Sequence, residues 1–244
     1  MHETITIKTD DGTCPAHVFK PSGAGPWPGV LFYMDGIGMR PALFPMGERL
    51  AAAGYYVLLP DVFYRAGAYT APDPTQLFGD PATRAAWFTK IREHAQPEMI
   101  MRDTRAFLDH LRAATSHDRF GTTGYCMGGR LSLTAAGTYP TEIAAAAAYH
   151  PGGLVTDQPD SPHLLAPKIK AVVYVGGASE DASFTDEQSR ALDQALTAAG
   201  VDHTVETYPA RHGWVPSDTP AHDPAQAERH WETLLALFER TLKR

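Results

Sequence analysis

Short apolar runs alternate with amphipathic stretches along most of the 244-residue chain. Six runs are rich in β-branched, aromatic or alanine residues, and most are flanked by Gly, Pro or Asp, which predicts buried strands. These predicted strands are 28–34, 55–60, 119–125, 143–149, 171–175 and 204–208. The last run alternates apolar and polar positions, which favours an edge strand. The run 143–149 is largely alanine and is compatible with helix by propensity, but its place between two helical segments favours a strand.

The segments between these runs carry apolar residues at helical spacing, as the positions of Leu108 and Leu111 illustrate. Gly54 and Gly200 directly follow two of these segments, where a residue in the left-handed conformation commonly ends a helix. The predicted helices are 42–53, 97–114, 130–138, 184–199 and 224–242.

Strands that alternate with helices predict a doubly wound, mostly parallel α/β sheet with right-handed crossovers and helices on both faces. The first 25 or so residues read instead as an antiparallel hairpin. A length prior of about 150 residues per domain is compatible with one domain spanning 1–244. The stretch 64–96 is rich in Pro, Gly and aromatic residues and interrupts the alternation. We interpret it either as a cap over a cleft or as an excursion packed on the surface.

The composition indicates a globular protein and argues against several classes of partner. The chain has 43% hydrophobic and 20% charged residues, which is typical of a globular protein. Its net charge of −7 provides no broad cationic surface, so we expect neither nucleic acid nor a membrane as a partner. The first residues lack the pattern of a secretory signal, and two cysteines are too few for a disulfide framework, so we expect a cytoplasmic protein. The sequence does not indicate the oligomeric state.

The strongest chemical motif directly follows the predicted strand 119–125. Residues 124–129 read GYCMGG, which is the nucleophile-elbow pattern G-x-S-x-G with Cys126 in the serine position. A sharp turn from strand to helix leaves no room for side chains at Gly124 and Gly128, and the start of the helix favours a thiolate. The backbone N–H of Met127 would then face the oxygen that becomes negative during acyl transfer.

Partners for this nucleophile occur in the expected order along the chain. Asp181 follows the predicted strand 171–175, with Glu180 as a competing acid beside it, and His212 follows the strand 204–208. We expect His212 to take the thiol proton and Asp181 to orient the imidazole.

A second oxyanion donor is expected in the loop after strand 28–34, where Gly36 is the natural candidate. Asp35 stands at the same strand end, within reach of the thiol. A carboxylate there would either hold the thiol protonated until substrate displaces it or accept its proton, and the sequence does not choose between these. A turn-forming role is the alternative for Asp35.

The elbow GYCMGGR, the stretches AGYYVLLPDVFYR, SEDASF and YPARHGW, and the closing ERHWETLLALF together resemble the dienelactone hydrolases (carboxymethylenebutenolidases) over nearly the whole chain. The resemblance implies an α/β-hydrolase fold, a triad of Cys126, Asp181 and His212, and oxyanion donors at Gly36 and Met127. It also implies that Asp35 takes the place of a glutamate that contacts the resting thiol. In the best-known member an arginine four residues after the histidine holds a substrate carboxylate. Pro216 stands there in this chain, so the resemblance implies hydrolysis without implying an acidic lactone.

The leading hypothesis is therefore a hydrolase of a small-molecule ester or lactone that works through a Cys126 acyl-enzyme. The alternatives are a thioesterase or acyltransferase, and a non-catalytic binding protein on the same scaffold. The 11 histidines show no metal-ligand spacing, and the glycines match no nucleotide-binding loop, so we expect no cofactor and no metal. Aromatic residues such as Phe78, Trp87 and Trp214 suggest an apolar cleft. For His150 and His163 we expect solvated or hydrogen-bonded structural roles over substrate contact, and for Cys14 a structural role.

Overall fold

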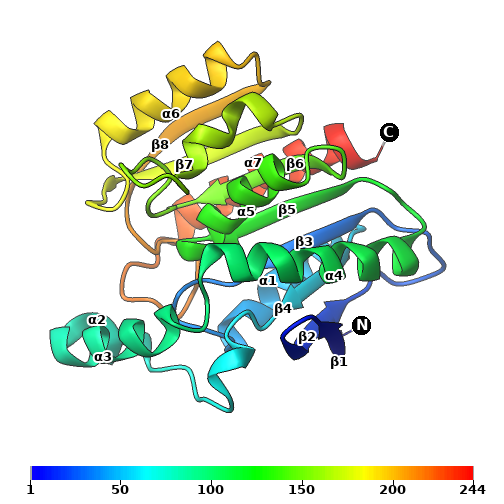
Figure 1. The fold of residues 1–244 in the computed structure, drawn as a ribbon, viewed down its shortest axis with the longest axis horizontal. Coiled ribbons are helices and arrows are strands. Elements are labelled where there is room, and N and C mark those ends of the chain that lie inside the picture. The colour runs from blue at the N-terminus through cyan, green and yellow to red at the C-terminus, as the bar shows by residue number, and fades with distance from the viewer. Residues whose placement is uncertain (1, 244) are drawn as a thin grey trace.

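A mixed eight-stranded sheet runs through the computed structural model, which describes residues 2–243 (Figure 1). The order across the sheet is β1-β2-β4-β3-β5-β6-β7-β8. Strands β1 and β2 form the predicted antiparallel hairpin, β2 also pairs antiparallel with β4, and every later pair is parallel. The strands are β1 (His2–Thr9), β2 (Gly12–Phe19), β3 (Gly29–Tyr33), β4 (Tyr56–Pro60), β5 (Phe120–Tyr125), β6 (Ile143–Tyr149), β7 (Val172–Glu180) and β8 (His203–Arg211).

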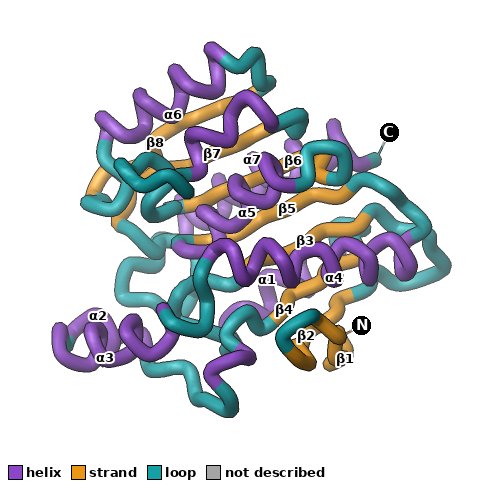
Figure 2. Tube along the Cα trace, viewed as in Figure 1, coloured by secondary structure: helices purple, strands orange, loops and turns teal. Residues whose placement is uncertain are grey.

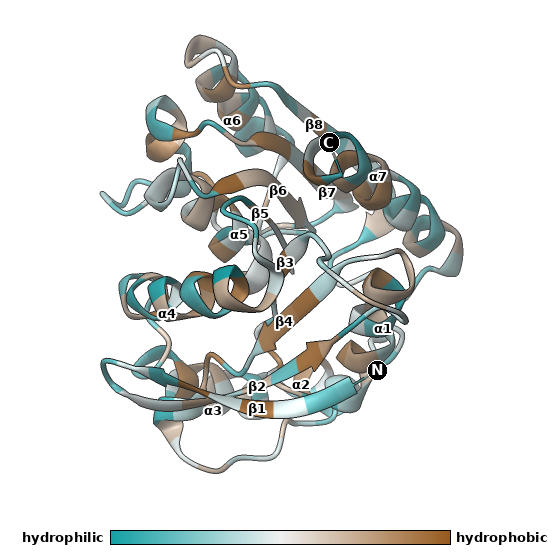
Figure 3. Ribbon diagram, turned by 90° about the vertical axis from the view of Figure 1, so that its right-hand side faces the viewer, coloured by the Kyte–Doolittle hydropathy of each residue, from teal (hydrophilic) through white to brown (hydrophobic). Residues whose placement is uncertain are grey.

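Helices cover both faces of this sheet, as the doubly wound pattern predicts. Figure 3 shows α4 and α5, with α6 above them, on one side of the strands and α1 and α7 on the other. The helices are α1 (Phe44–Ala52), α2 (Pro74–Gly79), α3 (Pro81–Arg92), α4 (Pro97–Thr115), α5 (Met127–Thr138), α6 (Asp186–Ala198) and α7 (Pro224–Leu242). Short 3₁₀ turns are η1 (Pro41–Leu43), η2 (Tyr64–Ala66) and η3 (Pro162–Lys168).

The central strands carry the core because both of their faces are covered. Every residue of β3, β4, β5 and β6 is buried. The alanine-rich run is the strand β6 that its position favoured. Its small side chains allow a close approach of α5: a Cβ built on Gly129 would lie 3.4 Å from the Cβ of Ala148. Parallel strands covered on both faces are generally continuous apolar runs, so the sequence pattern and the burial agree.

Two strands are longer than their apolar runs. β7 continues to Glu180 and β8 to Arg211, beyond the predicted ends at 175 and 208. Pairing with the neighbouring strand, with Glu180 opposite Arg211, extends both across polar residues that a hydrophobicity pattern does not register. β8 lies at the edge of the sheet, as its alternation predicts. Helix α5 begins at Met127, three residues before the predicted start, because the chain turns directly from β5 into the helix.

The segment 64–96 contains two helices that we did not predict, α2 and α3 (Figure 2). They extend away from the sheet in Figure 1. The indole of Trp87 on α3 donates a hydrogen bond to the carbonyl of Gly36 at 2.9 Å. The hydroxyl of Tyr69 donates to Asp61 at 2.7 Å and accepts from the Met39 amide at 3.0 Å. These contacts attach the segment to the loops that follow β3 and β4.

None of the helices within residues 2–243 combines the length and the apolar composition needed to cross a membrane.

Asp223 caps the closing helix and provides a test of how α7 stabilises the fold. Its carboxylate accepts hydrogen bonds from the Ala225 and Gln226 amides, both at 3.0 Å. We expect Asp223→Ala to lower the free energy of unfolding by about 1 kcal/mol, because the first turn of α7 loses its cap. Urea denaturation measures this. Glu232→Ala, which removes an exposed carboxylate from the same helix, is the matched control. Equal stability of both variants would contradict the capping role.

Candidate active site

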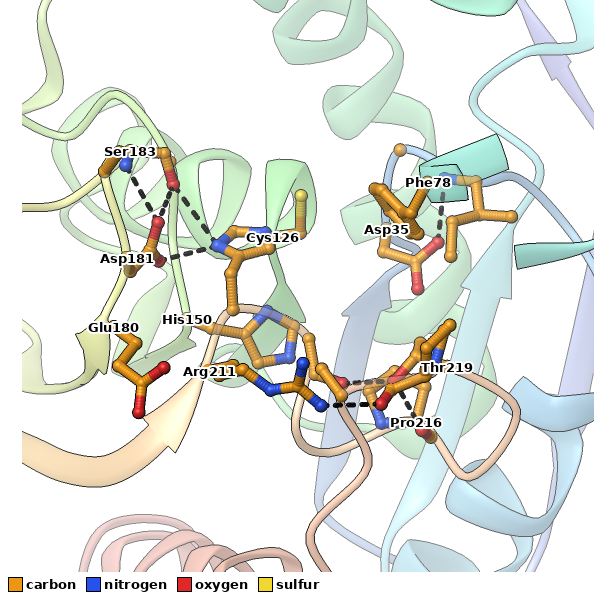
Figure 4. A pocket seen from close by; sticks show the side chains of 18 of the residues that line it. Asp35, Phe78, Cys126, His150, Glu180, Asp181, Ser183, Arg211, Pro216 and Thr219 are labelled. Atoms are coloured by element: carbon orange, nitrogen blue, oxygen red, sulfur yellow. Dashed lines mark hydrogen bonds and ion pairs between the residues drawn. The ribbon is translucent and has the colours of Figure 1, made fainter. Parts of the chain in front are cut away.

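Parallel strands bring the predicted site residues to one edge of the sheet. Cys126 follows β5, His150 follows β6, Asp181 follows β7, and His212 follows β8. Asp35 lies two residues beyond the end of β3. The carboxyl ends of neighbouring parallel strands share one edge, which is where ligand sites of open α/β sheets form. Figure 4 shows Asp181 and Ser183 on one side of Cys126 and Asp35 on the other.

The turn that presents Cys126 depends on glycine for steric reasons. Cys126 has φ 54° and ψ −117°, an unfavourable backbone conformation for a side chain. A Cβ on Gly124 would lie 2.1 Å from the carbonyl oxygen of Gly128, and a Cβ on Gly128 would lie 2.3 Å from the carbonyl oxygen of Tyr33. In both cases the added Cβ would overlap a backbone carbonyl oxygen, which cannot move aside. The glycines on either side of Cys126 are therefore required because the turn leaves no room for side chains, as the elbow motif suggested.

His212 and Asp181 form a direct hydrogen bond. Nδ1 of His212 lies 2.6 Å from Oδ2 of Asp181. The hydroxyl and amide of Ser183 both donate to the other oxygen of Asp181, at 2.5 and 2.8 Å, and the Ser183 hydroxyl lies 3.2 Å from the same His212 nitrogen. With its Nδ1 engaged, the imidazole has Nε2 available for the thiol. Glu180, the competing acid, has an exposed side chain, whereas Asp181 is bonded.

Electrostatics favour a charged His212. Burial alone would lower its pKa, but the charge of Cys126 and the hydrogen bond to Asp181 outweigh burial and raise the pKa from 6.5 to about 10. Burial likewise tends to raise the pKa of Asp181, and the hydrogen bond and charge of His212 reverse this, so that the pKa is lowered. An imidazolium between a carboxylate and a thiolate is the arrangement that activates a cysteine nucleophile.

The two residues predicted to supply the oxyanion donors lie next to each other. A Cβ built on Gly36 would be 3.9 Å from the Cβ of Met127. Met127 is the first residue of α5, so its amide has no acceptor one turn earlier within the helix. The carbonyl of Gly36 is held by the Trp87 indole, which fixes the orientation of the loop. Sequence reasoning missed this role of Trp87, because no motif links it to Gly36.

Asp35 lies in the wall of the site, and its carboxylate is bound to an arginine. Both of its oxygens accept from Arg40, at 2.7 and 2.9 Å, and one also accepts from the Ile37 amide at 2.9 Å. Arg40 also binds both oxygens of Asp218, at 2.7 and 3.1 Å. Among the described residues, the hydrogen bonds of Asp35 do not include one to Cys126. The influence of Asp35 on the thiol stays a prediction. The sequence gave no signal that Asp35 would pair with Arg40, five residues later.

Cys126 opens into a cavity of about 520 Å³. Phe78 and Phe88 line it, so the segment 64–96 contributes apolar side chains to its wall. Trp87 and Trp214, which we also expected near the cleft, are buried and are not among the lining residues. The other lining residues include Ile37, Gly152, Glu180, Ala182, Arg211, Pro216, Thr219, Pro220 and Ala221.

The expectation for the two loop histidines holds for one and is wrong for the other. Nδ1 of His163 lies 2.7 Å from the Ser161 hydroxyl, which is a structural role. His150 is only 1% exposed, and neither of its ring nitrogens has a hydrogen-bond partner on another described residue. The ring is therefore not solvated, and no other described residue holds it through a hydrogen bond. Sequence could not reveal this, because the ring is enclosed by residues from distant strands.

No group of three or more His, Cys, Asp or Glu side chains within the described range 2–243 is arranged to hold a metal ion. Cys14, the other cysteine, is fully buried on β2, away from the cavity wall.

Comparison with known proteins agrees with this architecture. The sequence profile of the "Dienelactone hydrolase family" matches residues 14–242. A "Carboxymethylenebutenolidase" of Rhodococcus opacus is 25% identical over 252 residues, covering 99% of this chain and 92% of the relative. A "Putative carboxymethylenebutenolidase" of Escherichia coli (strain K12) is 26% identical over 245 residues, covering 96% and 85%. The crystal structure of a "Putative Dienelactone Hydrolase" from Klebsiella pneumoniae superposes with a TM-score of 0.84 at 23% identity, covering 98% of each chain. The predicted α/β-hydrolase fold is confirmed.

The two adjacent acids at the end of β7 can be separated by mutation. We expect Asp181→Asn to lower kcat/KM for ester hydrolysis by about 10²-fold or more, because the amide no longer stabilises the imidazolium of His212. Glu180→Gln, which removes the neighbouring exposed charge, should retain most of the activity. Measuring kcat/KM of both variants on one ester decides which of the two acids supports His212. A larger loss in Glu180→Gln would assign the acid to Glu180 instead.

The pKa of His212 gives a second test. We expect its ring resonances in NMR to titrate near pH 10, and at a lower pH in Cys126→Ala, because the variant loses the neighbouring thiolate that raises the pKa of His212 while Asp181 remains. Since the pKa is raised on folding, the stability that protonated His212 contributes is complete below about pH 6.5 and is lost as pH rises through about 10. Titration near 6.5 in the wild type would show that no charged pair forms.

Proposed function

This chain belongs to the dienelactone hydrolase family, whose members act on lactone or ester bonds, and we propose that it cleaves such a bond through an acyl-enzyme on Cys126. The observation that carries the proposal is the convergence on one cavity of a cysteine at a strained elbow and a histidine hydrogen-bonded to a buried acid. Each member of this set comes from a different strand end. A scaffold that only binds a ligand has no need of that alignment.

In the acylation step, the Cys126 thiolate attacks the carbonyl carbon of the substrate. The carbonyl oxygen becomes negative and is stabilised by the backbone N–H groups of Gly36 and Met127, two residues that lie close together. His212, held by Asp181, gives its proton to the leaving alkoxide as the bond from carbon to oxygen breaks. When the substrate is an ester, the product alcohol leaves the active site. When the substrate is a lactone, the new hydroxyl group stays attached to the enzyme through the acyl group.

In the deacylation step, neutral His212 takes a proton from water while the water oxygen attacks the thioester carbon. The same two amides stabilise the second tetrahedral intermediate, and the bond from carbon to sulfur then breaks. Cys126 leaves as a thiolate beside the imidazolium, which restores the charged pair that raises the pKa of His212. The free acid is the second product, and no cofactor takes part in either step.

Three features shape the substrate in this proposal. The segment 64–96 acts as a cap, because Phe78 and Phe88 line the cavity and Trp87 fixes the oxyanion loop. The buried carboxylate of Asp35 is neutralised by Arg40, and Asp35 acts on the reaction by holding the loop that carries Gly36. At the rim, Glu180 and Arg211 carry opposite charges on paired strands. The wall is mainly apolar otherwise, so it suits a neutral substrate better than an anion.

A panel assay of the wild type and Cys126→Ala tests this proposal. The panel contains p-nitrophenyl acetate, a neutral lactone and dienelactone. We expect turnover by the wild type and its loss in Cys126→Ala. We expect Cys126→Ser to retain less activity than the wild type, by about 10²-fold or more, because a site built for a thiolate activates a hydroxyl poorly. Equal, near-background rates in the wild type and Cys126→Ala would favour a binding protein, and serine activity equal to the wild type would refute the tuning for sulfur.

Two further measurements separate hydrolysis from its alternatives. Mass spectrometry of the protein after rapid mixing with p-nitrophenyl acetate should show an added acetyl group on Cys126. Cys14 is fully buried and serves as the internal control thiol. Product analysis with a competing alcohol or amine distinguishes the two acceptors: acid as the main product supports hydrolysis, and ester or amide as the main product supports an acyltransferase.

A further inference from the structure

His150 is a polar residue in the cavity wall that the mechanism does not use. It directly follows β6 at the same sheet edge as Cys126, and it is among the residues that line the same cavity. Figure 4 shows the ring among the side chains that surround the cavity. It is 1% exposed, and neither nitrogen has a hydrogen-bond partner on another described residue. Buried polar groups in folded proteins are nearly always paired, so an unpaired ring in a binding cavity calls for a partner outside the chain.

The position of this ring is fixed. The backbone of His150 has φ 37°, in the left-handed region, and its amide donates to the carbonyl of Gly176 at 2.8 Å. The ring packs edge-on against His212 and Trp214, with centroids 5.1 and 5.0 Å away. It has little freedom to turn toward solvent or toward another backbone group. A ring held this firmly is suited to recognition, because its donor and acceptor are already oriented before a ligand arrives.

Its charge state is also constrained. Burial is the main cause that lowers the pKa of His150 well below 6.5, and repulsion from His212 and His230 acts in the same direction. The ring is therefore neutral around pH 7, with one nitrogen donating and the other accepting. A neutral imidazole pairs with a hydroxyl or a carbonyl oxygen. It does not compensate the desolvation of a carboxylate as an arginine does.

We propose that His150 is a substrate-binding residue that hydrogen-bonds a neutral oxygen on the carbon next to the scissile carbonyl. The His150 ring lies 5.1 Å from the His212 ring, and His212 interacts directly with the Cys126 sulfur. Because the two rings are neighbours, we place an oxygen bound to His150 near the carbon that sulfur attacks, on the adjacent carbon of the substrate. The substrate class is an uncharged 2-hydroxy or 2-oxo ester or lactone. This inference rests on the proposed hydrolysis at Cys126 and specifies its substrate.

A pair of esters that differ by one hydroxyl tests the assignment. Phenyl 2-hydroxypropanoate and phenyl propanoate share a leaving group and a carbon skeleton, and each rate is divided by the rate of hydroxide-catalysed hydrolysis. We expect the wild type to prefer the hydroxy ester by about tenfold or more in this corrected kcat/KM. His150→Phe keeps a ring but has no nitrogen, and we expect the preference to fall to about one. His150→Asn keeps a donor and an acceptor and tolerates positive φ, so much of the preference should return.

The design separates recognition from structure. The propanoate ester is the internal control, because a general loss of activity or stability lowers both rates and leaves their ratio unchanged. Thermal unfolding shows whether each variant is folded, and His163→Phe, a histidine outside the cavity wall, should keep the wild-type ratio. An unchanged ratio in folded His150→Phe, or no wild-type preference, overturns the assignment while hydrolysis at Cys126 stands. Turnover of neither ester by the wild type contradicts both proposals.

Discussion

The site depends on the turn between β5 and α5, where the chain reverses too sharply for side chains at its flanks. Gly124 and Gly128 bring backbone atoms so close together that a Cβ at either position would overlap a carbonyl oxygen. Cys126 takes the strained positive φ between them. Because of this turn, the sulfur stands at the sheet edge at the start of α5, and the Met127 amide lies beside it. Every other candidate group has a role only relative to that position.

The remaining groups are brought to the sulfur by the parallel order of β3, β5, β6, β7 and β8. Loops beyond those strand ends need further support, and polar contacts between distant segments provide it. Arg40 joins Asp35 after β3 to Asp218 in the loop after β8. Trp87 and Tyr69 join the segment 64–96 to the loop that carries Gly36. A change in the capping segment therefore acts on the oxyanion loop directly, through hydrogen bonds to its backbone.

The cavity combines paired charges with one unpaired neutral ring. Asp181 is paired with His212, and Asp35 shares Arg40 with Asp218. His150 differs from these groups in having no partner on another described residue. Membership of the dienelactone hydrolase family covers residues 14–242 and accounts for the fold and the class of bond. Identity of about 25% to the curated relatives leaves the cavity wall free to differ, and there we locate the specificity of this chain.

The sequence by itself determined what local chemistry dictates. Continuous apolar runs predicted β3 to β6, since strands covered on both faces need no polar alternation. The glycine spacing around Cys126 predicted the turn, because no other residue fits it. Asp181 and His212 followed from their places after predicted strands. Tertiary structure decided whatever depends on partners far apart in the chain: the pairing of Asp35 with Arg40, the hydrogen bond from Trp87 to Gly36, the burial of Trp214 and the isolation of His150. These depend on distances between segments, which hydrophobic periodicity does not encode.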